Sequence, residues 1–142
     1  MGNARREALR VNSDSRITLE FHGAALTSDA GLAAYRELDE ALSLMEMADE
    51  VLRDSRQGKN TRHELIGLLR QSVYSRLAGY EDTNDAERLA VDPAMRQVVG
   101  GRAADREAAS TSQMGRFETE ILTARKNRKA LMNLSGKWID RV

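Results

Sequence analysis

Apolar residues along most of this chain recur every three or four positions, which predicts helices that each bury one face. The first begins at Thr27-Ser28-Asp29, where a hydroxyl cap and an acid in the first turn favour a helix start. Its buried face is expected at Leu32, Tyr35, Leu38 and Leu42. Residues 44–52 predict a second helix with an acidic outer side, and residues 54–61 predict a loop.

The strongest helical pattern lies between His63 and Ala78. Apolar side chains cover most of its circumference, at Leu65, Ile66, Leu68, Leu69, Val73, Tyr74 and Leu77. Glu64, Gln71 and Ser75 leave only a narrow polar stripe. Because a helix that is apolar nearly all round must be covered on all sides, it is expected at the centre of a bundle.

Three helix-start signals follow one another between residues 79 and 118: Asn84-x-x-Glu87, Asp92-Pro93 and Ser110-x-x-Gln113. The first and third have the spacing of a capping box, and the second places proline at the first helical position. The second helix is expected to end at Gly100-Gly101, followed by a polar loop or weak helix at 102–109. A last, longer helix is expected from Glu118 to Trp138.

The N-terminal part has a different pattern. Residues 1–15 are polar and predict a flexible leader, whereas residues 16–22 alternate apolar and polar side chains as a half-buried strand does. No second strand pattern is found in the sequence. Because an isolated strand is unstable, its partner is expected in another chain or in sequence not present here.

These patterns together predict an all-α fold, a multi-helix bundle with one short N-terminal β-strand, in a single domain over residues 16–142. Aromatic residues make up only 4%, so the core must consist mainly of aliphatic side chains. The absence of cysteine excludes disulfides and thiolate zinc sites. No apolar run resembles a secretory signal or a membrane span, so a cytoplasmic protein without membrane contact is expected.

The net charge is zero, but the charges are distributed in blocks. Residues 17–50 carry a net charge of −7 and residues 81–115 carry −3, whereas residues 51–80 and 116–142 each carry +4. Such blocks favour one surface for a polyanion and another for protein contacts. A solvated surface laced with ion pairs explains the same charges equally well.

The sequence does not contain the pattern of a self-sufficient active site. His22 and His63 are far apart, and Gly100-Gly101 lacks the flanking lysine of a phosphate-binding loop. The acids Glu81, Asp82 and Asp85 fall at a helix start, where capping explains them better than a metal site. No catalytic residue, metal ligand or cofactor is therefore expected in this chain.

Residues 92–142 are the candidate DNA-reading part. A helix-turn-helix could be formed by Pro93–Val99 and Ser110–Glu118, although the interval is longer than the usual tight turn. Gln113 would then pair with adenine, Arg116 with guanine or a phosphate, and the hydroxyl of Ser112 with a phosphate. An ordinary capped surface helix is the competing interpretation.

Four further bases, Arg125, Lys126, Arg128 and Lys129, lie close together in the last predicted helix. Each phosphate that they neutralise would release counterions and make binding sensitive to salt. A solvated helix face is the alternative. Arg62, Arg70 and Arg76 are weaker candidates, because they belong to the central helix, which is expected to be largely buried.

Several segments occur in an order that matches one known family. Residues 26–32, LTSDAGL, are similar to an "LTSDGG" opening, and residues 109–118 are similar to an "ASQPTLSRLE"-type segment. Leu69-Arg70-Gln71, Gly79-Tyr80-Glu81-Asp82, Asn84-Asp85 and Asp92-Pro93 match between them. The chain thus resembles bacterial insertion-sequence transposases of the insertion-sequence 1380 family, with a DDE domain of group 1, over roughly residues 17–142.

The resemblance implies a protein that cuts and joins transposon ends in DNA transposition, using two Asp, one Glu and divalent metal ions such as Mg²⁺. In relatives the first catalytic aspartate follows the segment that matches Gly136–Val142, and Asp140 does not match it. The resemblance therefore implies an N-terminal region, truncated before the catalytic core, that binds double-stranded terminal inverted repeats. The strand at Ile17–Phe21 would then pair within the absent catalytic sheet.

Two other functions remain open on the sequence alone. The chain could be an interaction module that forms a homodimer or supports the intact transposase through its acidic helices at residues 28–52. It could also be a vestigial fragment that is inactive, or that inhibits the intact transposase by occupying the transposon ends.

Overall fold

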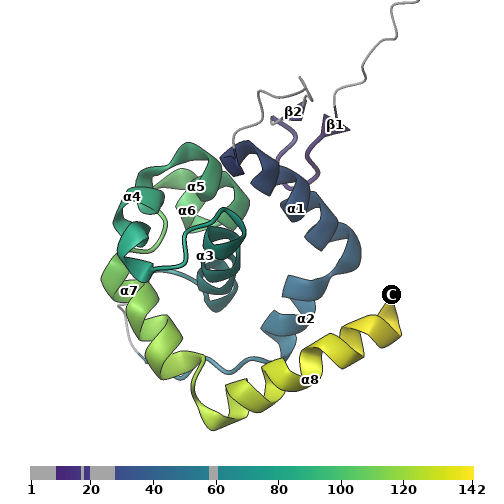
Figure 1. Ribbon diagram of the computed structural model, residues 1–142, viewed down its shortest axis with the longest axis vertical. Helices are drawn as coiled ribbons and strands as arrows, with labels where there is room; N and C mark the ends of the chain where they lie inside the picture. Colours follow the sequence, from purple (N-terminus) through teal and green to yellow (C-terminus); the bar gives the residue numbers. More distant parts are fainter. Residues whose placement is uncertain (1–8, 17, 20–27, 58–60) are drawn as a thin grey trace, which may run out of the picture.

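The computed structural model describes residues 9–16, 18, 19, 28–57 and 61–142, and it is mainly helical (Figure 1). The longer helices are α1 (Ser28–Leu42), α2 (Leu44–Val51), α3 (Leu65–Leu77) and α8 (Arg125–Arg141). Between α3 and α8 lie η2 (Thr83–Asp85), α4 (Ala86–Val91), α5 (Pro93–Val99), α6 (Arg102–Asp105), α7 (Thr111–Arg116) and the π-helical η3 (Phe117–Ile121). The predicted all-α class is confirmed.

Helix α3 is the centre of the bundle, as its sequence predicts, and Figure 1 shows the other helices arranged around it. It contributes Leu65, Leu68 and Leu69 to a cluster with α2, α7, η3 and α8, which we call the α8 cluster. It contributes Tyr74 to a second cluster with α1, α4, α5 and α6, which we call the α5 cluster. Each cluster closes over one side of the same helix, because α3 has apolar residues on both.

The polar stripe predicted on α3 is wrong at Gln71, which is only 1% exposed. Its amide faces the backbone of Ala109: Gln71 Nε2 donates to the carbonyl at 2.7 Å, and Gln71 Oε1 accepts from the N–H at 2.8 Å. A buried amide is stable here because the segment before α7 offers one donor and one acceptor at the matching spacing.

The first two helices agree with their predicted bounds, but the buried face of α1 does not. Leu32 is 1% exposed, whereas Tyr35 and Leu38 remain about half exposed. Between the helices, Ser43 adopts a left-handed conformation with φ 57°, which turns the chain away from the α1 axis. The Asp39 carboxylate then accepts from the Met45 N–H at 2.9 Å and supports the first turn of α2.

The N-terminal strand departs from the prediction. Only Thr18–Leu19 (β2) is in strand conformation, and Arg16 lies in a turn; Ile17 and residues 20–22 lie outside the described residues. The strand pairs antiparallel with Leu9–Arg10 (β1), within the segment that was expected to be a flexible leader. The expectation of a partner outside this chain is therefore wrong for this pair. The leader segment lacks the alternating pattern that would have revealed it.

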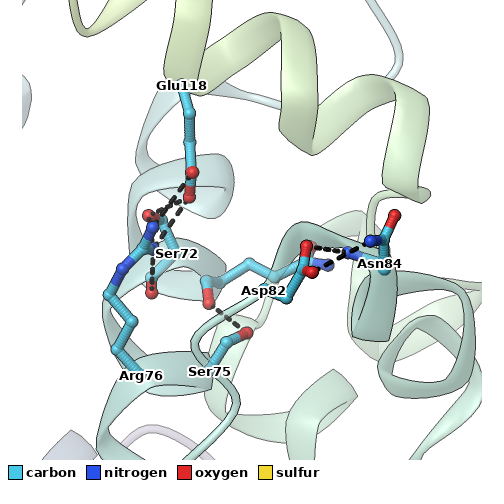
Figure 2. A network of polar contacts seen from close by, with 7 residues as sticks. Ser72, Ser75, Arg76, Asp82, Asn84 and Glu118 are labelled. Carbon is cyan, nitrogen blue, oxygen red and sulfur yellow. Dashed lines mark hydrogen bonds and ion pairs between the residues drawn. The ribbon is translucent and has the colours of Figure 1, made fainter.

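Of the three helix-start signals predicted between residues 79 and 118, the structure confirms those at Asp92 and Ser110 but not the one at Asn84. Asp92 caps α5 by accepting from the Met95 N–H at 2.8 Å, and Gly100 and Gly101 end it with φ 74° and 53°, as predicted. The capping box at Asn84 and Glu87 is wrong. Asp82 instead caps η2 by accepting from the Asn84 N–H at 2.9 Å (Figure 2). The Asp82 carboxylate, two residues before Asn84, already binds the Asn84 N–H that Glu87 would have bound in the capping box.

The single helix predicted for residues 118–138 is divided. Its first part is the π-helical η3, and Ala124 is extended before α8 begins at Arg125. Asn127, 1% exposed, fills the bend: its Nδ2 donates to the carbonyls of Ile121 and Arg53 at 2.9 Å each, and its Oδ1 accepts from the Arg53 N–H at 2.7 Å. The side chain thus gives the Ile121 carbonyl a second donor beside the Ala124 N–H and joins the start of α8 to the backbone of Arg53.

The predicted helix-turn-helix is not supported. The one-turn helix α6 lies between α5 and α7, and α7 packs against η2 and α4, whereas α5 packs against α1, α3, α4 and α6. The two helices therefore do not form the positioning and reading pair of that motif. In the part of the chain that the structure describes, no helix is long and apolar enough to cross a membrane.

Candidate nucleic-acid interface

Two adjoining hollows open around His63, where the start of α3 faces α7. One, of about 290 Å³, lies between residues 56, 57 and 61–63, α7 and η3. The other, of about 680 Å³, lies between the start of α3, α4, α6 and residues 106–110. Arg62, His63 and Gln113 line both, so we treat the pair as one surface and call it the His63 cleft.

The bases that line the His63 cleft are all arginines: Arg56, Arg62, Arg102, Arg106 and Arg116. Three glutamates, Glu87, Glu107 and Glu120, lie on the same lining. Arg56 is paired with Asp54 at 2.6 Å. The other four form no ion pair with any carboxylate in the described part of the chain, although all four are exposed. The cleft thus holds guanidinium groups that the fold itself does not use.

The pKa of His63 reflects the positive charge in the cleft. Its side chain is buried, and the pKa of the imidazole is lowered from its ordinary value, first by burial and then by the positive charges of Arg102, Arg56 and Arg62. Two arginines that precede α3 and one arginine of α6 therefore lower the pKa of the same imidazole. The imidazole is neutral at physiological pH and can accept or donate a hydrogen bond.

Helix α7 supplies the residues predicted to read bases. Ser112 and Arg116 are exposed, and Gln113 is partly buried. The capping box at its start is confirmed: the Ser110 hydroxyl accepts from the Gln113 N–H at 3.4 Å, and Gln113 Oε1 accepts from the Ser110 N–H at 2.9 Å. A bidentate contact to adenine would need that same oxygen, so Gln113 would have to give up the cap to make it.

The second predicted basic group forms the first turns of α8. Arg125, Lys126, Arg128 and Lys129 are all exposed, and none pairs with a carboxylate among the described residues. Ala124 provides no side-chain cap and the first turn contains no acid. Four positive charges therefore stand at the positive end of a 17-residue helix dipole, which destabilises an isolated helix.

Other arginines are engaged in the fold. Arg76 on α3 makes two bonds to Glu118 of η3, at 2.8 and 3.0 Å, and Ser72 donates to the same carboxylate (Figure 2). The bond from Arg76 is the main cause that lowers the pKa of Glu118 below its ordinary value. Arg70 donates to the Val99 carbonyl, and Arg96 to the carbonyls of Ala103 and Ala104. Arg70 and Arg76 thus connect α3 with α5 and with η3, and Arg96 connects α5 with α6.

The comparison with known families decides the affiliation of the chain. Residues 9–142 match the family model described as Transposase DDE domain group 1. The chain belongs to this transposase family. No curated protein and no solved structure matches it.

The metal site that the resemblance implies for such transposases does not fit this part of the protein. Among the residues described, no three His, Asp or Glu side chains gather closely enough to hold a metal ion. The acids Glu81, Asp82 and Asp85 surround the start of η2, where Asp82 acts as a cap.

Gln113 and Arg116, two residues predicted to contact DNA, line the His63 cleft, whereas most of its arginines were not among the predicted residues. Arg62 was set aside as part of the buried central helix, yet α3 begins only at Leu65 and Arg62 is exposed. Setting aside Arg70 and Arg76 is consistent with their contacts within the fold. Arg102 and Arg106, four residues apart in the segment predicted as a weak helix, were the available signal.

Proposed function

We propose that this chain is the N-terminal DNA-binding and assembly region of a DDE transposase of the insertion-sequence 1380 family. Its partner is the double-stranded terminal inverted repeat of the transposon. The observation that carries the proposal is the basic start of α8, where four exposed bases stand without a described acidic partner. Family membership supplies the class of partner, since a transposase must engage DNA.

The arrangement of these bases favours a polyanion as their counter-charge. Cations at a helix N-terminus oppose the dipole, and each costs about 0.3–1 kcal/mol when exposed. A DNA phosphate would offset that cost, because it interacts favourably with the bases and with the free N–H groups of the first turn. Asn127 holds the loop at Arg53 against this end of α8, so a further exposed base lies beside the four.

In this proposal the basic start of α8 contacts phosphates and α7 contacts the duplex near it. Arg125, Lys126, Arg128 and Lys129 bind the backbone and set affinity. Arg116 and Ser112 are exposed and available for a base edge or a phosphate, whereas Gln113 reads adenine only if its cap opens. The proposal concerns binding; the cutting and joining of strands is assigned to no residue of this chain.

Binding to a fluorescein-labelled duplex carrying the terminal inverted repeat, measured by anisotropy across a salt series, tests the proposal. The variant Arg125→Ala/Arg128→Ala should weaken binding and reduce the slope of log K against log salt by about two, because two phosphate contacts are lost. The matched control is Lys137→Ala/Arg141→Ala, which removes the same charge from the far end of the same helix.

Equal slopes for the wild type and the Arg125→Ala/Arg128→Ala variant would refute the phosphate role of α8. Failure of the wild type to bind any duplex at low ionic strength would refute DNA binding altogether. Magnesium-dependent nicking of the duplex by the purified chain would contradict the separation of binding from catalysis.

A second candidate function is protein contact, and a specific observation favours it. Tyr35 and Leu38 are about half exposed on α1, beside the acidic outer sides of α1 and α2. Exposed apolar side chains within a charged rim are typical of interaction surfaces. Light scattering of the free chain and of its DNA complex distinguishes protein contact from DNA binding. A dimerisation module is dimeric without DNA.

A further inference from the structure

We infer that the His63 cleft is a second site for the DNA backbone, separate from the basic start of α8. The inference rests on the proposed function and adds a location to it: the duplex contacts the protein at two places, and guanidinium groups bind phosphates at the second. The cleft is formed by side chains from residues 56, 57 and 61–68, from α4 and from residues 102–121, so it exists only in the folded chain.

The chemistry of the lining favours phosphate over other anions. Every base in the cleft is an arginine, whose planar fork binds a phosphate through two parallel hydrogen bonds. The guanidinium groups are spread over two adjoining hollows instead of converging on one point. A single small anion would need convergence, whereas consecutive phosphates of one strand match a row of separated charges.

Four of the cleft arginines are available to bind a ligand, because no carboxylate in the described part of the chain pairs with them. Arg62, Arg102, Arg106 and Arg116 have no ion pair within the described residues, and the five arginines of the lining outnumber its three glutamates. The lowered pKa of His63 agrees with this, because three of the cleft arginines act on it in the same direction. The glutamates limit where a phosphate can lie; Glu87 is already turned toward the Thr111 N–H, at 3.4 Å.

The cleft and the basic start of α8 are linked by two short stretches of chain. Asn127 of α8 binds both backbone groups of Arg53, and three residues later Arg56 lines the cleft. Arg116 lines the cleft from α7, and η3 joins α7 to α8. In this inference one duplex contacts both the start of α8 and the cleft.

The test is the double variant Arg102→Ala/Arg106→Ala in the anisotropy assay with the inverted-repeat duplex and with a scrambled duplex of the same composition. Both side chains are exposed and make no described hydrogen bond, so the fold should be unaffected, and a melting curve checks this. Binding should weaken roughly tenfold for both duplexes, and the salt slope should fall by about two. The charge-preserving Arg102→Lys/Arg106→Lys variant should recover most of that slope.

The outcomes separate this inference from the proposed function. If Arg102→Ala/Arg106→Ala binds like the control Lys137→Ala/Arg141→Ala while Arg125→Ala/Arg128→Ala still binds weakly, the cleft is not a DNA site and the α8 proposal stands. If all three variants bind alike, both ideas are wrong.

A second readout does not depend on substitution of an arginine. DNA phosphates in the cleft would offset the charges of the arginines around His63, so saturating duplex should raise the imidazole pKa in an NMR titration. The variant His63→Gln identifies the signal. An imidazole pKa that is unchanged in the DNA complex would overturn the inference, whatever the affinities show.

Discussion

The helices around α3 and the surface around His63 are both rich in arginine, but they use it in opposite ways. Around α3, Arg70, Arg76 and Arg96 donate to backbone carbonyls or to a carboxylate of another segment. Around His63, Arg62 and Arg102 have no such acceptor in the described residues. Residue type alone therefore does not reveal function; the acceptors available in the fold do.

The difference follows from desolvation. A guanidinium or amide that is removed from water must find partners, because an unsatisfied buried polar group costs about 1–3 kcal/mol. Gln71 and Arg76 of α3 are accordingly bound by the structure and should affect stability when changed. Those around His63 and at the start of α8 remain in water, so their removal should affect binding and leave stability nearly unchanged.

The largest effect is expected for Gln71→Ala. The change removes two bonds to Ala109 and leaves a buried N–H and carbonyl without partners, which should lower the free energy of unfolding by about 3 kcal/mol. Urea denaturation measures it. Gln57→Ala, at an exposed glutamine in the loop before α3, is the matched control and should change stability by less than about 0.5 kcal/mol. A loss of similar size in both variants would contradict the comparison.

A smaller effect is expected for the pair of Arg76 and Glu118. Both groups are partly exposed, so solvent screening reduces the coupling to about 1 kcal/mol in a double-mutant cycle of Arg76→Ala and Glu118→Gln. Because the pKa of Glu118 is lowered in the folded chain, this stabilisation is present above the ordinary glutamate pKa of 4.5 and lost as pH falls through the lowered value. Coupling that persisted well below that pH would argue against an ionic origin.

The smallest effect, and one of opposite sign, is expected at the start of α8. Arg125→Ala/Arg128→Ala removes two cations from the positive end of the helix dipole and should raise the free energy of unfolding by about 0.5 kcal/mol. Thermal denaturation compares it with Arg141→Ala, which removes a favourable cation from the last turn. A clear loss of stability in the α8-start variant would mean that these bases serve the fold.

Much of the fold could be predicted from local signals. The central position of α3 follows from its nearly continuous apolar surface, and the start of α5 follows from Asp92 and Pro93. The break before α8 could not be predicted, because it depends on Asn127 meeting the backbone of Arg53, which is distant in sequence. The pairing of β1 with β2 could not be predicted either, because β1 has only two residues and these are too few to show an alternating pattern.

The candidate site was less predictable than the fold. Exposure of the α8 bases was expected from their clustering, and their number and spacing are visible in the sequence. The His63 cleft is different, because Arg62 precedes α3, Arg102 lies on α6 and Arg116 on α7, and the three line the cleft only in the folded chain. A sequence pattern cannot show which of several scattered arginines keep a free guanidinium after folding.

The position of α3 also determines how the chain loses its structure. Because this one helix contributes side chains to both apolar clusters, removing α3 would take packing partners from both at once. Melting should consequently proceed as a single cooperative step, and a protease cut on either side of α3 should release no piece that stays folded. A displacement of the helices around one cluster on DNA binding would therefore also move the helices around the other cluster, because α3 packs against both.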